Sequence, residues 1–63
     1  MSNETETFLI HIVAASDKAV RVAFNGKSVW LPKSQIERWK DEDKREGTAT
    51  ITIPLWLYDK HWD

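Results

Sequence analysis

Apolar and polar side chains alternate most clearly in the middle of the chain, on both sides of Asn25-Gly26. Both residues tolerate the positive φ of a type I′ turn, so the pattern predicts a β-hairpin of residues 18–24 and 27–31. A two-residue loop sets the register and places Arg21 opposite Trp30, on the face with small neighbours. The other face is apolar and contains Val20, Val22, Phe24, Val29 and Leu31.

Two further segments have the polarity of β-strands. Residues 48–53 alternate threonine with apolar residues, which is typical of a strand with one buried face. Residues 8–14 carry apolar side chains on both faces, which indicates a strand that bends between two layers or lies centrally in a small barrel. Pro54 then favours a terminal helical turn over residues 55–62. Proline lacks a backbone N–H, and the N–H groups in the first turn of a helix have no helical partner in any case.

The segment after the hairpin predicts less regular structure. Pro32 has no N–H for a sheet, so strand pairing is expected to end there. Residues 34–40 predict a short helical turn, with Ile36 and Trp39 three positions apart on one face. Residues 40–47 are nearly all charged, with both signs, and predict a solvated loop.

Together these elements predict a mostly β fold: a small antiparallel SH3-like or open barrel of about four strands with short helical turns. An α+β sheet covered on one face is the alternative. Residues 1–7 are polar and are expected to form a flexible N-terminus, and residues 8–63 a single small β-barrel-like domain. A chain of 63 residues buries only about 60% of its unfolded surface, so modest stability is expected.

Composition narrows the environment and the partners. Nine basic and ten acidic residues give a formal net charge of −1, which provides no general attraction to phosphate. The chain has no cysteine, which favours a cytoplasmic location and leaves a homodimer as one way to gain stability. No apolar stretch approaches the roughly 20 residues that span a bilayer, so no membrane association is expected.

The sequence contains no pattern that indicates catalysis. Neither His11 nor His61 has a sequence neighbour that suggests a nucleophile or a metal pair. Acid–base chemistry needs matched groups in a pocket, and so small a domain seldom encloses the several hundred cubic ångströms of a small-molecule site. We therefore expect that the protein is not an enzyme and that it has neither a cofactor nor a metal site.

Three segments resemble a pattern in short, largely uncharacterised proteins of phage and bacterial mobile-element genomes. They are residues 18–20 (KAV), 25–36 (NGKSVWLPKSQI) and 51–57 (ITIPLWL). The resemblance implies a small β-barrel-like domain in a phage context, where such proteins often bind nucleic acid or host machinery. It implies no active site.

The candidate binding residues combine aromatic rings with cations. Arg21 opposite Trp30 allows a guanidinium to lie over an indole, although Trp30 buried beneath Ile36, Trp39 or the terminal turn is the alternative. After the stiffening Pro32, a cation and an amide can be presented at a fixed corner. The candidates are Lys18, Arg21, Trp30, Lys33, Gln35, Trp39 and Trp56.

These residues favour a non-enzymatic protein-binding module, since Trp, Tyr and Arg dominate interface energetics. In the phage context we expect it to occupy a surface of a host or phage protein. One example is an inhibitor, such as an anti-CRISPR protein, that blocks a defence complex. The alternative is a small single-stranded nucleic-acid-binding protein that uses Lys18, Arg21, Trp30 and Lys33. A protein partner ranks first, nucleic acid second, and a homodimer is possible.

Overall fold

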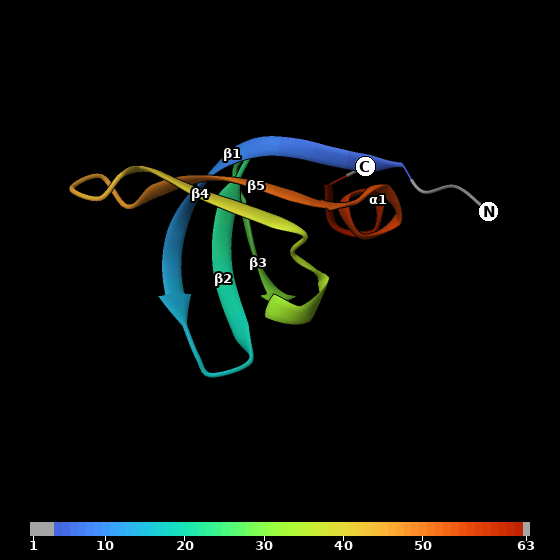
Figure 1. Ribbon diagram of the computed structural model, residues 1–63, viewed down its shortest axis with the longest axis horizontal. Helices are drawn as coiled ribbons and strands as arrows, with labels where there is room; N and C mark the ends of the chain where they lie inside the picture. Colours follow the sequence, from blue (N-terminus) through green and yellow to red (C-terminus); the bar gives the residue numbers. More distant parts are fainter. Residues whose placement is uncertain (1–3, 63) are drawn as a thin grey trace.

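The computed structural model describes residues 4–62, whose five strands form one antiparallel sheet in the order β3-β2-β1-β5-β4. The sheet curls strongly, and a short helix lies at one end of it (Figure 1). This confirms the predicted mostly β fold, a small open barrel of SH3-like arrangement. The elements are β1 (Thr5–Ala15), β2 (Ala19–Phe24), β3 (Lys27–Pro32), the 3₁₀ turn η1 (Lys33–Gln35), β4 (Arg38–Asp43), β5 (Thr48–Pro54) and α1 (Leu55–Trp62).

Strand β1 belongs to both halves of the barrel. Its residues 5–11 pair with β5 and its residues 11–15 pair with β2, with a bulge between Ile12 and Ala14. Figure 1 shows β1 running along the top of the sheet and then bending sharply downward. The prediction of a strand that bends between layers is therefore confirmed, and a bulge is a usual means of bending one.

The predicted boundary of the flexible N-terminus differs from the structure. Strand β1 begins at Thr5, so residues 5–7 are part of the sheet, whereas residues 1–3 lie outside the described part of the chain. Pairing with β5 holds this end, and the Thr7 and Thr52 hydroxyls form a hydrogen bond of 2.8 Å. The polar composition of residues 5–7 gave no sign of a strand, because Thr7 is exposed and contacts Thr52 instead of the apolar core.

The hairpin has the predicted register. Asn25 and Gly26 have φ values of 53° and 77°, as a type I′ turn requires. Arg21 lies opposite Trp30, and Val20 lies opposite Leu31. The local turn chemistry therefore sets the whole pairing of β2 with β3.

The segment from residue 34 to residue 47 was predicted only in part, because residues 34–35 lie in a helical turn and residues 44–47 form a turn, but residues 38–43 form a strand. Helical geometry is confined to η1, and residues of the expected helix and charged loop instead form β4, whose six residues are all exposed. Strand β4 lies at the edge of the sheet and pairs only with β5, which allows a sequence of charges to form a strand. The described chain consequently has five strands rather than about four.

A tight turn joins β4 to β5. The Asp43 carboxylate accepts hydrogen bonds from the Arg45 and Glu46 backbone N–H groups, at 2.9 and 3.2 Å. Gly47 has a φ of 71°, in the left-handed region that glycine adopts readily. The charged stretch is thus a strand followed by an ordered turn.

The core lies inside the curled sheet and beneath α1. On β5 the alternating residues Ala49, Ile51 and Ile53 are all fully buried, as their spacing predicts. Leu57 is the buried residue of α1. The buried apolar residues are Phe8, Ile10, Val20, Val22, Leu31, Ala49, Ile51, Ile53 and Leu57.

Helix α1 closes the barrel end at which Phe8 and Phe24 lie. The Trp62 ring centroid is 5.3 Å from that of Phe8 and 5.8 Å from that of Phe24. The Trp62 indole N–H also donates to the Phe24 carbonyl, at 3.1 Å. Trp62 is therefore part of a cap over this end of the barrel.

Candidate binding groove

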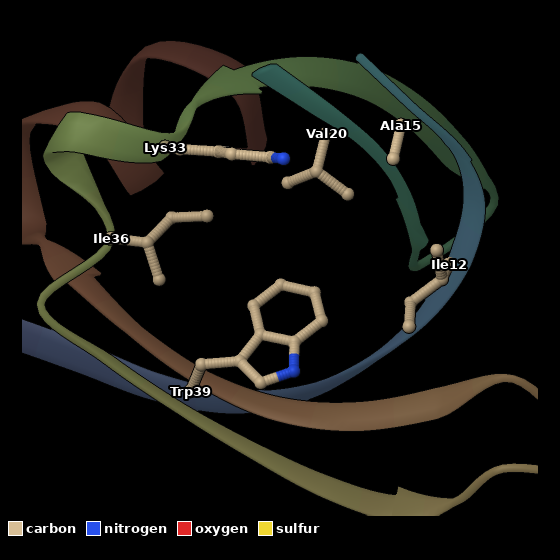
Figure 2. A pocket seen from close by; sticks show the side chains of 6 residues that line it. All are labelled: Ile12, Ala15, Val20, Lys33, Ile36 and Trp39. Atoms are coloured by element: carbon tan, nitrogen blue, oxygen red, sulfur yellow. The ribbon is translucent and has the colours of Figure 1, made fainter. Parts of the chain in front are cut away.

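An apolar groove lies at the opposite end of β2 from α1. Phe24 ends β2 under the helix, whereas Val20, near its start, forms part of the groove wall. The groove has a volume of about 430 Å³. Figure 2 shows its lining side chains converging from β1, β2, the η1 region and β4. They are Ile12, Ala15, Val20, Lys33, Ile36 and Trp39.

The bulge in β1 shapes one wall of the groove. Ile12 pairs with Val22 on the inner face, but beyond the bulge Ala14 pairs with Arg21 on the outer face. The extra residue therefore reverses the alternation and turns Ala15 to the inner side, opposite Val20. A small residue at this position leaves space that a larger side chain would fill.

The turn η1 forms the second wall. The Lys33 backbone N–H donates to the Lys18 carbonyl at 2.8 Å, which ties η1 to the loop between β1 and β2. The Ile36 N–H donates to the Lys33 carbonyl at 3.1 Å, so the two residues remain adjacent. Figure 2 shows the Lys33 side chain extended across the groove with its ammonium nitrogen near Val20.

Trp39 forms the floor of the groove near the sheet edge. It lies on β4 opposite the buried Ile51 and is 40% exposed. Its indole N–H donates to an Asp41 carboxylate oxygen at 2.8 Å. This hydrogen bond fixes the ring and satisfies its only polar atom, so the carbon surface of the ring is available for contact.

The predicted site residues are distributed over three surfaces. Lys33 and Trp39 line the groove, and the backbone bond to Lys33 places Lys18 at its margin. Gln35 is half-buried in η1. Trp56 is 58% exposed on α1, outside the groove.

Arg21 and Trp30 form a separate pair on the outer face of the sheet. Trp30 is 48% exposed, so the alternative in which it is buried is wrong. The Arg21 guanidinium donates to the Ser28 hydroxyl at 3.2 Å, and no cation–π pair is found among residues 4–62. The four residues expected to bind nucleic acid are therefore divided, with Arg21 and Trp30 on the outer face and Lys18 and Lys33 at the groove.

Four groove residues were not predicted as site residues. Ile12, Ala15, Val20 and Ile36 have the sequence character of core positions, and their role depends on the bulge and on the place of η1. The three-residue spacing of Ile36 and Trp39 was a usable signal. These two residues do share a surface, although Ile36 directly follows η1 and Trp39 lies on β4, so no helix places them there.

A second, polar depression of about 500 Å³ lies on the outer face where β1, β5 and β4 are adjacent. Arg38 and Lys40 rise over threonines of the neighbouring strands. One of these, Thr50, donates to the Glu42 carboxylate at 2.8 Å. The lining consists of Thr7, Arg38, Trp39, Lys40, Thr50 and Thr52.

His61 lies on α1, at the other end of the barrel from the groove. Partial burial lowers the pKa of His61 below its ordinary value, and the charges of Lys60 and Lys27 lower it further. The Lys27 ammonium also donates to the His61 carbonyl. Within residues 4–62, no group of three or more acidic, histidine or cysteine side chains is arranged to hold a metal ion.

A groove of about 430 Å³ is thus present at the surface of this small domain. Comparison of the chain with protein-family models, with curated proteins and with solved structures finds no match. Among the described residues, no helix has both the length and the apolar character needed to cross a membrane.

Proposed function

We propose that the chain is a non-enzymatic protein-binding module that receives a segment of a partner protein in its apolar groove. The observation that carries the proposal is Trp39, a large ring left 40% exposed on a strand and fixed by Asp41. A rigid aromatic in a concave apolar setting is typical of residues that dominate binding energy. Ile12 and Ile36 extend the apolar surface on both sides of the ring.

The proposed setting is a phage or mobile element acting in the bacterial cytoplasm. It rests on the resemblance of the segments NGKSVWLPKSQI and ITIPLWL. There the module occupies a surface of a host or phage protein. One example is an inhibitor, such as an anti-CRISPR protein, that blocks a defence complex. Binding by occupation requires only a stable surface, which suits a small rigid barrel.

Affinity capture with three matched proteins tests this proposal. The tagged wild type, Trp39→Ala and Trp56→Ala are each incubated with lysate of infected bacteria, after circular dichroism has shown that all three are folded. A partner retained by wild type and Trp56→Ala but lost with Trp39→Ala supports the groove. A partner that Trp39→Ala retains in full would refute it. Light scattering in the same buffer determines whether the chain forms a homodimer.

The outer face supports a second candidate function, binding of single-stranded nucleic acid. Trp30 and Arg21 lie at one side of this face, and Arg38 and Lys40 at the other, with threonine hydroxyls between them. Exposed aromatics with flanking cations are the usual components of such surfaces. Trp fluorescence with labelled oligothymidine tests it, at low and at physiological salt. Salt-sensitive quenching that Trp30→Ala abolishes supports it, and an unchanged spectrum refutes it.

A further inference from the structure

We infer that the groove takes a peptide segment in which a bulky apolar side chain stands next to a carboxylate, with the carboxylate at the Lys33 end. This inference rests on the proposed function and specifies the chemistry of the partner. It depends on the placement of one cation in an otherwise apolar lining, and on the carboxylate already present at the far side of Trp39.

Lys33 gives the groove its charge. Five of the six lining residues are apolar, and the sixth extends its ammonium group over the surface that they form (Figure 2). Bringing an apolar ligand onto this surface removes water from around the ammonium group, which costs free energy unless an anion replaces that water. A neutral ligand leaves the ammonium partly desolvated, and a cationic ligand adds repulsion.

Asp41 gives the groove a direction. Its carboxylate accepts the Trp39 N–H at 2.8 Å, so the side of the ring nearest β4 already carries a negative charge. A second carboxylate at this side meets repulsion, whereas one near Lys33 meets attraction. The acidic group of the peptide is therefore at the η1 end, and its apolar group lies over Trp39 and Ile12.

The groove is largely preformed. Two backbone hydrogen bonds hold Lys33 and Ile36, at 2.8 and 3.1 Å, and a side-chain bond holds Trp39. A volume of about 430 Å³ is within the range of binding pockets, about 300–1,000 Å³. It accommodates one large side chain and the adjacent acidic residue, so a dipeptide is the shortest useful probe.

The experiment is an NMR titration with three N-acetylated dipeptide amides, Phe-Asp, Phe-Asn and Phe-Lys. The readout is the shift of the Ile12 and Ile36 methyl groups and of the Trp39 indole N–H. Such small ligands are expected to bind with a Kd on the order of millimolar. At low salt, we expect wild type to bind Phe-Asp about three- to tenfold more tightly than Phe-Asn, and Phe-Lys least tightly.

Lys33→Glu is the reversing variant, and Lys60→Glu is the control with the same change in charge. Lys60 is exposed on α1, away from the groove, so its variant should retain the preference for Phe-Asp. Lys33→Glu should prefer Phe-Lys instead. Both substitutions change exposed side chains, and heteronuclear spectra with native dispersion show that the variants are folded.

The outcomes separate this inference from the proposed function. Equal binding of the three peptides at the groove overturns the choice of an acidic partner but leaves a protein-binding groove. A preference for Phe-Asp that Lys33→Glu does not weaken overturns the role of Lys33. Shifts confined to residues outside the groove, or no shifts at millimolar peptide, overturn this inference, whereas the capture experiment with Trp39→Ala decides the proposed function separately.

Discussion

Truncation of Trp62 tests whether α1 is an integral cap of the barrel. Trp62 is half-buried, and its ring lies 5.3 Å from Phe8, 5.8 Å from Phe24 and 5.7 Å from Tyr58, between centroids. Truncation of a buried Trp to Ala costs about 3–5 kcal/mol, and partial exposure reduces this. We therefore expect Trp62→Ala to lower the free energy of unfolding by about 2–4 kcal/mol.

This loss is large for so short a chain. A domain of 63 residues is expected to have a free energy of unfolding of about 3–9 kcal/mol in total. Urea unfolding followed by far-UV circular dichroism measures the change without relying on tryptophan fluorescence. With an m-value of about 1 kcal/mol/M, the midpoint should fall by about 2–4 M or the protein should be unfolded in water.

A milder variant keeps the test decisive if Trp62→Ala does not fold. Trp62→Phe retains an aromatic ring but removes the N–H that donates to the Phe24 carbonyl at 3.1 Å. We expect a loss of about 1–2 kcal/mol. Trp56→Ala is the control, because Trp56 is 58% exposed and should cost less than about 0.5 kcal/mol. If Trp62→Ala matched this control at an unchanged m-value, the cap would be refuted.

Three further predictions concern the turn, the core and pH. Gly26→Ala should cost about 1–2 kcal/mol in thermal unfolding, because its φ of 77° is unfavourable for alanine while no atom within 4 Å obstructs a Cβ; an unchanged Tm would contradict this. Ile51→Ala should cost about 2–5 kcal/mol in urea, since Ile51 is fully buried, whereas Leu9→Ala, at a position 52% exposed, should change stability by less than about 0.5 kcal/mol. The lowered pKa of His61 means that the unfolded chain binds a proton more readily than the folded one. Its contribution is therefore complete above the ordinary pKa of 6.5 and is lost as pH falls through the lowered folded value. His61→Gln should flatten this part of the dependence of the urea midpoint on pH between about 7.5 and 5.5, and a slope identical to that of wild type would contradict the assignment.

Local chemistry in the sequence was enough to predict some elements completely. Asn25 and Gly26 determine a turn type by their own backbone preferences, and the turn then sets the register of β2 with β3. Strand β5 is equally direct, because every second residue from Ala49 to Ile53 meets the core. Where one face of an element is wholly buried, its hydrophobic period is its signal.

Strand β4 has no such signal. It pairs on one side only, and its inward position Trp39 lies at the opening of the barrel rather than in the core. Its charges are therefore compatible with a strand but do not predict one. The groove depends on features that involve residues far apart in the sequence. These are the bulge after Ile12 and the backbone hydrogen bond from Lys33 to Lys18. Neither follows from the residues that participate in it.

The two barrel ends differ in how their aromatic rings are used, and this difference limits how the groove can bind. At one end, α1 brings its rings against Phe8 and Phe24. At the other end, covering the exposed 40% of Trp39 would bury about 60–100 Å² and contribute about 2 kcal/mol. Association costs at least about 4 kcal/mol in lost freedom, so Trp39 alone does not hold a partner. A tight partner must therefore also contact Ile12, Ile36 and Lys33, or add backbone hydrogen bonds along the edge strand β4, whereas a dipeptide binds weakly.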